Sequence, residues 1–307
     1  MSATDATANP AASFEPYRRR LLGLAYRMLG SMSDAEDAVQ DAYLRWHAAD
    51  RASVSDARAF LMTTTTRICL DMLTSARARR EEYVGPWLPE PVVDTAALAP
   101  DSRTELAEDL SIALLLTLDR LSPLERAAFL LHDVFDFSFG EVAAALERSE
   151  AACRQLASRA RAHVRAVRPR GAVPPPSRAG AIDPKHAELL STFTAATRSG
   201  DLGALTQLLA GDVRVVTDGG GKAPAALNVL EGADRASRFL VGATRKGWRD
   251  DYTLRFAPIN GLPGIIIDAP DGPVQTVAFE IDDDVIRAVY VVRNTDKLRH
   301  IPAPASS

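Results

Sequence analysis

The stretch SFGEVAAALERSEAACRQLASRARAHVR (138–165) predicts a short helix, a tight turn and a longer basic helix. The Ser-x-x-Glu pattern at Ser138 matches a capping box, and Ser149 stands where it can cap the second helix. At about 100° per residue, apolar side chains share one face of that second helix: Cys153, Leu156, Ala160, Val164 and Val167. This order is typical of a helix-turn-helix, whose second helix enters the major groove of DNA.

Arginines dominate the outer side of this second helix. Residues 148–170 contain seven arginines and one acidic residue, Glu150. Arg154 and Gln155 stand in the second turn, where Arg can bind guanine and Gln can pair with adenine. The expected DNA contacts, with phosphate contacts from the later arginines, are Arg148, Ser149, Arg154, Gln155, Arg159 and Arg161. A solvated basic face, or a helical hairpin that binds protein, remains an alternative.

Two further helices are expected before this unit. Helix 33–47 collects four acids within two turns: Asp34, Glu36, Asp37 and Asp41. Acids near a helix N-terminus are favoured by the helix dipole, and they could equally form a surface that docks on another protein. A later helix, about 56–82, forms a second basic surface with Arg58, Arg67, Arg77, Arg79 and Arg80.

Capping boxes predict where the helices begin. Four Ser-x-x-Glu patterns each precede an apolar-periodic run: SDAE (33–36), SRTE (102–105), SPLE (122–125) and SFGE (138–141). SPLE also places Pro123 at the first helical position, where its missing N–H costs nothing. We therefore expect helices at 123–132 and at about 139–146.

Two proline-rich joints, 84–101 and 168–180, divide the 307 residues into three blocks. The third block is helical to about Leu209 and then alternates β-branched runs with Gly, Pro and Asp, which indicates an α+β domain with an antiparallel sheet. The net charge of −4 gives no hint of a polyanion partner, so charge is read locally.

The same composition excludes several classes of protein. Cys69 and Cys153 are isolated, so we expect buried thiols and neither a disulfide framework nor a zinc site. The first 13 residues lack the features of a signal peptide, and no apolar run approaches the ~20 residues that span a bilayer. We expect a cytoplasmic protein.

Specific motifs resemble a known family. Residues 14–83, with DAEDAVQDAYLRW (34–46), resemble the second conserved region of extracytoplasmic-function (ECF) sigma factors, and residues 121–165 resemble their fourth region. YVGPWLPEP (83–91), DGGGK (218–222) and NTDKL (294–298) resemble the ECF group with a fused C-terminal SnoaL-like domain.

The resemblance implies a multidomain fold. Two all-α domains, the second with the helix-turn-helix, would precede an α+β, cone-shaped SnoaL-like domain of the nuclear-transport-factor-two-like superfamily. The implied boundaries are region 2 at 12–83, a proline-rich linker at 84–102, region 4 at 103–168, a second linker at 169–182 and the SnoaL-like domain at 183–301.

The resemblance also implies a promoter-specificity subunit of RNA polymerase, a monomer when free, that is not an enzyme and needs no cofactor. The polymerase β′ clamp helices would bind Asp34, Asp37, Gln40 and Asp41, and region 4 would also reach the β flap. The loop 51–56 and the helix after it would read the −10 element, and the arginine helix would read the −35 element. TDGGGKA (217–223) is no Walker A loop, so binding energy must drive DNA melting.

The third domain is expected to regulate the factor in cis. The residues implied in this contact are Trp87, Leu88, Pro89, Asp218, Gly219, Gly220, Gly221, Lys222, Asn294, Asp296 and Lys297. Two residues depart from the family pattern, because Glu147 replaces the usual turn glycine and Thr295 replaces a proline.

Two other functions remain open. A cyclase or isomerase would need acid or base groups in the cone, with the dispersed candidates His186, Asp218, Asp251 and His300. A ligand-responsive DNA-binding regulator would need only the helix-turn-helix, usually as a symmetric dimer on a palindromic site, and would respond to an unidentified small molecule in the cone. The acidic helix 33–47 argues against it.

Overall fold

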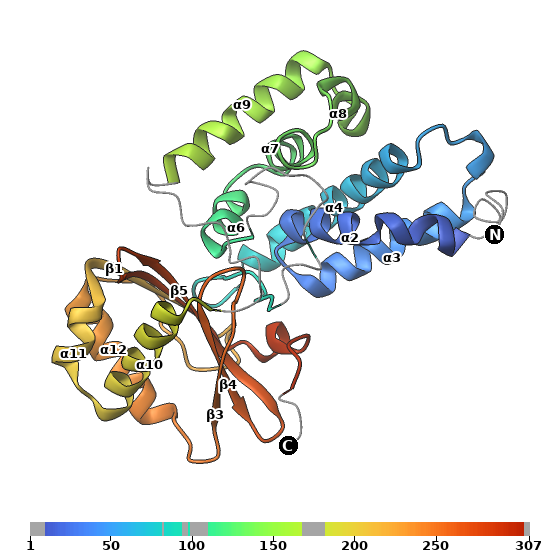
Figure 1. The fold of residues 1–307 in the computed structure, drawn as a ribbon. Helices are drawn as coiled ribbons and strands as arrows, with labels where there is room; N and C mark the ends of the chain where they lie inside the picture. Colours follow the sequence, from blue (N-terminus) through green and yellow to red (C-terminus); the bar gives the residue numbers. More distant parts are fainter. Residues whose placement is uncertain (1–9, 82, 94–97, 99–109, 168–181, 304–307) are drawn as a thin grey trace. The chain divides into compact units, whose positions relative to one another are not determined.

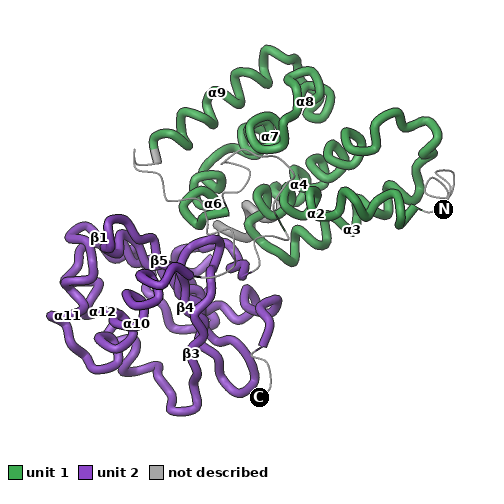
Figure 2. The backbone as a smooth tube through the Cα atoms, viewed as in Figure 1, with its two compact units in different colours: residues 1–81, 95–171 green, residues 82–94, 172–307 purple. Residues whose placement is uncertain are grey.

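The computed structural model describes residues 10–81, 83–93, 98, 110–167 and 182–303. The chain forms two compact units, one of residues 1–81 and 95–171 (unit 1) and one of residues 82–94 and 172–307 (unit 2) (Figure 2). Segment 82–94, which lies between the two parts of unit 1 in sequence, therefore belongs to the C-terminal unit.

Three long helices form the first part of unit 1 (Figure 1): α2 (Pro10–Leu29), α3 (Met32–Ala48) and α4 (Ala57–Glu81). They bury an apolar core, and the Trp46 ring packs 5.6 Å from that of Phe60. The predicted capping box at SDAE is wrong. Ser31 is the N-cap, its side chain accepts from the Asp34 N–H, and the helix begins at Met32, one residue before Ser33.

The second part of unit 1 contains α6 (Ile112–Asp119), α7 (Pro123–Phe129), a π-helical turn (Leu130–Val134), α8 (Phe139–Leu146) and α9 (Glu150–Val167). The capping boxes of SPLE and SFGE are confirmed at Ser122 and Ser138. The predicted helix 123–132 is α-helical only to Phe129, since the π-helical turn follows. The SRTE box lies outside the described residues.

The turn between α8 and α9 contains a left-handed residue at the position where the family pattern has a glycine. Glu147 adopts φ 53° and ψ 48°, and its N–H caps the carbonyl of Ala143. The Ala152 N–H donates to the Ser149 hydroxyl at 3.2 Å, as predicted for the cap of α9. Along α9, Cys153, Leu156, Ala157, Ala160 and Val164 are buried, so its apolar face is anchored in the core; the side chain of Val167 is outside the described set.

Unit 2 is an α+β domain. Its helices are α10 (Pro184–Ser199), α11 (Leu202–Leu208) and α12 (Ala233–Gly247). Its strands are β1 (Leu209–Asp218), β2 (Leu230–Glu231), β3 (Thr253–Phe256), β4 (Gly264–Ala269), β5 (Gly272–Asp282) and β6 (Val285–Val292), and a 3-10 turn, η4 (Thr295–Leu298), follows.

The sheet has the order β2-β1-β6-β5-β4-β3. The predicted antiparallel sheet is wrong in one respect, because β1 and β6 pair in parallel and the sheet is mixed. A parallel pair needs a long crossover, and the segment between β1 and β6 contains α12 and four other strands. Helix α12 has no counterpart in the predicted elements.

The core of unit 2 lies between the sheet and its helices, which gather on one side of it (Figure 1). Phe193 of α10 and Phe279 of β5 meet edge to face with their ring centroids 4.9 Å apart. In the described part of the chain, no helix is long and apolar enough to cross a membrane. Cys69 and Cys153 are buried free thiols, and burial raises the pKa of each.

Candidate functional site

Asp218, the last residue of β1, anchors a cluster within unit 2. Its carboxylate is fully buried and accepts two hydrogen bonds from the N-terminal part of this unit. The Leu88 N–H donates to Oδ2 at 2.8 Å, and the Tyr83 hydroxyl donates to Oδ1 at 2.5 Å. Strand β1 thus ends at a carboxylate that binds segment 83–92, which we call the linker segment.

Lys297 completes this cluster from η4. Its ammonium lies 2.7 Å from Asp218 Oδ2 and donates to the Leu88 carbonyl oxygen at 2.5 Å. It also lies 4.4 Å from the centroid of the Trp87 ring and 5.0 Å from that of the Tyr83 ring. A buried ion pair is stable only when the other hydrogen-bonding groups of both side chains also have partners. Here the backbone and the aromatic rings of the linker segment are those partners.

The glycine loop allows this close approach. Gly220 has φ +56°, and a Cβ there would lie 2.2 Å from Asn294 Nδ2 and 2.8 Å from the Tyr83 hydroxyl. Asn294 Nδ2 itself donates to that hydroxyl at 3.0 Å. Any side chain at Gly220 would therefore displace Asn294 and Tyr83.

The other end of the linker segment is held by two residues of unit 2. The Val92 N–H donates to Asn260 Oδ1 at 3.1 Å, and the Asn260 N–H donates to the Val92 carbonyl at 2.7 Å. His300 Nε2 lies 2.5 Å from the Pro91 carbonyl oxygen. Leu88 and Val92 are 0% and 5% exposed, so the segment is bound by both its backbone and its apolar side chains.

An exposed ion pair joins the glycine loop to η4. Lys222 and Asp296 form an ion pair, and the hydrogen bond from Lys222 holds the pKa of Asp296 below its ordinary value. Burial, and then the hydrogen bond to Asp218, raise the pKa of the Tyr83 hydroxyl. Thr295 replaces the proline of the family motif, yet Asn294 still caps η4 by accepting from the Asp296 N–H.

The structure therefore brings together most of the residues predicted for regulation. Gly219 and Gly221 belong to the same loop, a Cβ on Gly221 would lie 3.4 Å from Val84, and Pro89 is buried in the linker segment. The prediction missed Asn260 and the role of Tyr83. Asn260-Gly261 is a common turn dipeptide with positive φ at both residues, so its pattern alone indicates a turn rather than a contact.

One predicted basic surface of unit 1, that of α4, contacts the first helix of the helix-turn-helix and the loop before it. Arg67 of α4 donates to the carbonyls of Ala144 and Ala145, both at 3.0 Å, and lies 3.1 Å from the Glu147 carboxylate. Arg58 packs its guanidinium 4.7 Å from the centroid of the Phe137 ring. Arg67 thus caps the C-terminus of α8 in the helix-turn-helix.

The acidic helix α3 presents a stripe to solvent. Asp37, Gln40, Asp41 and Leu44 are exposed at spacings of three and four residues, and Leu44 is 53% exposed although it is apolar. Asp34 is half-buried near the helix N-terminus. Ala38, Val39 and Ala42 of this helix are buried, whereas Leu44 is not.

Helix α9 exposes most of its predicted DNA contacts: Arg148 and Ser149 just before it, and Arg154, Gln155 and Arg159 within it. Three of its arginines are paired: Arg154 with Glu150 at 2.5 Å, Arg159 with Glu125 at 2.7 Å and Arg161 with Asp133 at 2.7 Å. Arg77, Arg79 and Arg80 lie in α4, but their side chains are outside the described set.

The acid and base candidates do not converge. Asp218 and His300 bind the linker segment, and Asp251 pairs with Arg249 at 2.9 Å. His186 stands at the start of α10. Among the described residues, no group of three or more His, Cys, Asp or Glu side chains could hold a metal ion.

Known proteins match both units. Residues 14–79 match the family Sigma-70 region 2, and residues 111–164 match the family Sigma-70, region 4. The chain is 39% identical to the ECF RNA polymerase sigma factor SigJ of Mycobacterium tuberculosis (strain ATCC 25618 / H37Rv), over 95% of this chain and 94% of that protein. It is 29% identical to the probable ECF RNA polymerase sigma factor SigI of the strain CDC 1551 / Oshkosh, over 92% of each.

A solved structure matches nearly the whole chain. The crystal structure of the Mycobacterium tuberculosis extracytoplasmic function sigma factor SigJ aligns with a TM-score of 0.68 at 35% identity, over 94% of this chain and 97% of that one. The sigma regions imply core RNA polymerase and promoter DNA as partners, and proteins of this kind regulate transcription rather than catalyse reactions. The chain belongs to the ECF RNA polymerase sigma factors.

Proposed function

We propose that this sigma factor controls its own promoter recognition through the linker segment, which the C-terminal unit holds. The Asp218–Lys297 cluster carries this proposal, because it binds Leu88 through both its N–H and its carbonyl. Segment 82–94 connects the two parts of unit 1 in sequence. Holding it limits how freely regions 2 and 4 can separate, so we propose that the cluster restrains transcription until it opens.

Helix α3 is the proposed docking face for the β′ clamp helices of core polymerase. Its stripe presents the carboxylates of Asp37 and Asp41 beside the exposed Leu44, and such a negative surface is complementary to a basic protein partner. Gln40 lies between the two acids, and Asp34 adds negative charge at the helix start. We propose the β flap as a second polymerase contact, made by region 4.

Helix α9 is the proposed reader of the −35 element. Arg154 and Gln155 are exposed in its second turn, where a recognition helix contacts base edges. Arg148 and Ser149 precede them, and Arg159 and Arg161 would exchange their acidic partners for phosphate. The positive charge of this face makes its DNA affinity dependent on salt.

Helix α4 and the loop before it are the proposed readers of the −10 element. Arg58 and Arg67 contact region 4, so these two side chains must leave Phe137 and the end of α8 before they can bind DNA. Arg77, Arg79 and Arg80, at the C-terminal end of α4, extend the same proposed surface. We propose that polymerase binding draws regions 2 and 4 apart and supplies this energy. We propose that the factor acts in the cytoplasm, where its polymerase is.

Transcription in vitro with core polymerase tests the docking role. Asp37→Lys should lower the affinity for core polymerase and weaken competition with a housekeeping sigma factor, because it reverses a charge within the stripe. The matched control is Asp234→Lys, which reverses an acid on the exposed face of α12. Unchanged affinity of Asp37→Lys, or an equal loss in the control, would contradict the docking face.

A further inference from the structure

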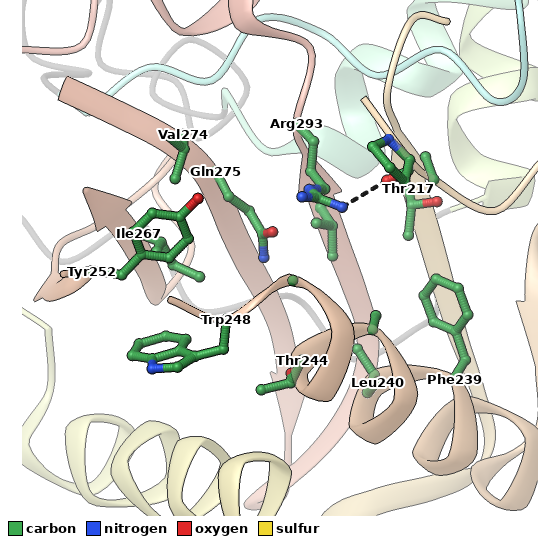
Figure 3. A pocket seen from close by; sticks show the side chains of 15 residues that line it. Thr217, Phe239, Leu240, Thr244, Trp248, Tyr252, Ile267, Val274, Gln275 and Arg293 are labelled. Carbon is green, nitrogen blue, oxygen red and sulfur yellow. Dashed lines mark hydrogen bonds between the residues drawn. The ribbon is translucent and has the colours of Figure 1, made fainter. Parts of the chain in front are cut away.

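A cavity opens in unit 2 between α12 and the strands of the sheet (Figure 3). Its volume is about 90 Å³, which is room for roughly six to nine water-sized groups. Its walls are mainly apolar and aromatic, with Phe239, Leu240, Trp248 and Tyr252 among them. Such concave apolar sites with a few polar groups are typical of small-molecule binding.

Arg293 places a positive charge in this wall. Its Nη1 donates to the Pro224 carbonyl at 2.8 Å, while its Nε is buried and has no hydrogen-bond partner in the described part of the chain. Within that same part, no ion pair to Arg293 is found and no residue lining the cavity is Asp, Glu or His. A buried guanidinium nitrogen without an acceptor is costly, and an anion bound in the cavity would satisfy it.

We propose that the cavity binds a small carboxylic acid with a flat apolar body. The carboxylate would accept from Arg293 in the two-pronged manner that guanidinium favours, and the body would pack on Trp248 and Tyr252. Gln275 lies beside Arg293 in the same wall and can donate to the acid. We assign it a binding role, because among the described residues its lining contains no carboxylate or imidazole beside the guanidinium.

The cavity shares its backbone with the cluster that holds the linker segment. Thr217 lines the cavity, and its neighbour Asp218 binds Leu88. Arg293 also lines the cavity, and its neighbour Asn294 binds Tyr83. The Arg293 N–H donates to the Asp218 carbonyl at 2.7 Å. An occupied cavity orders this wall, and the linker segment is then released less often. This coupling rests on the proposed function, whereas the binding does not.

Ligand-observed NMR on the full chain tests the binding with benzoate, phenylacetate and 3-phenylpropionate, each beside its neutral amide. At least one acid should bind the wild type tenfold or more tightly than its amide. Arg293→Gln should abolish that preference with an unchanged melting temperature. Arg287→Gln, which removes an exposed arginine of β6 six residues earlier in the chain, should keep it. Thr244→Phe, which places a ring at the cavity wall, should weaken acids and amides alike.

Binding and coupling are tested by separate outcomes. Binding of no acid in the panel, equal binding of acids and amides, or a preference that survives in Arg293→Gln would overturn the anion site. If the acid binds as expected, hydrogen exchange at Leu88 should slow when it is added. Exchange that is unchanged would overturn the coupling alone, and leaves the role of the linker segment to the transcription experiments.

Discussion

Asp218→Asn should release the linker segment. The carboxylate is fully buried, and its ion pair with Lys297 is also buried, since the Lys297 side chain is 9% exposed. Removing one partner of a buried pair costs about 3–5 kcal/mol, because it leaves the other charge uncompensated. Lys297 keeps the Leu88 carbonyl and two aromatic rings, so we take the lower end, about 3 kcal/mol.

At about 1.4 kcal/mol for each factor of ten, this cost raises the fraction of molecules in which the linker segment has left Asp218 roughly a hundredfold. Native-state hydrogen exchange at the Leu88 amide measures it, since that amide exchanges only when its bond to Asp218 opens. The matched control is Asp268→Asn, a carboxylate 1% exposed that pairs with Arg255 away from the linker segment. Exchange at Leu88 that is unchanged in Asp218→Asn, or equally faster in Asp268→Asn, would refute the reasoning.

Three further outcomes are expected. Glu147→Gly should raise the free energy of unfolding, measured by thermal melting, by about 0–1 kcal/mol. The relief of strain at the left-handed residue outweighs the loss of its exposed ion pair with Arg67; a clear loss of stability would contradict this. Arg154→Ala should lower promoter-selective transcription more than polymerase affinity, and equal losses would oppose the division of roles. The raised pKa of Tyr83 favours its neutral form, so its stabilisation of the cluster is present below pH ~10 and lost as pH rises beyond it. Leu88 exchange, corrected for its intrinsic pH dependence, should therefore accelerate above pH ~10 in the wild type more than in Tyr83→Phe.

Local signals predicted the helical unit well. The capping boxes at Ser122 and Ser138 each combine two side chains within four residues, so they need no knowledge of distant contacts. The turn position at Glu147 could be expected only from the family resemblance, in which a glycine stands there. The box at Ser33 failed because Ser31, two residues earlier, caps the helix through the Asp34 N–H, so Ser33 already lies inside the helix.

Long-range pairing explains what sequence patterns missed. The parallel contact of β1 with β6 depends on a crossover of more than sixty residues, and no local pattern encodes which strands pair across it. Asn260 binds Val92 across 168 residues, which no local pattern encodes. The motifs around Asp218 and Lys297 could be proposed from family resemblance, but the burial of their ion pair could not.

Transcription by the full chain tests the central claim most directly. Core polymerase with the wild type and with Asp218→Asn is assayed on a promoter that the wild type recognises, beside Asp268→Asn. The restraint proposed for the linker segment predicts promoter-dependent transcript from the wild type and a higher yield from Asp218→Asn alone. A yield that is unchanged or lower in Asp218→Asn, while its Leu88 amide exchanges faster, would contradict it.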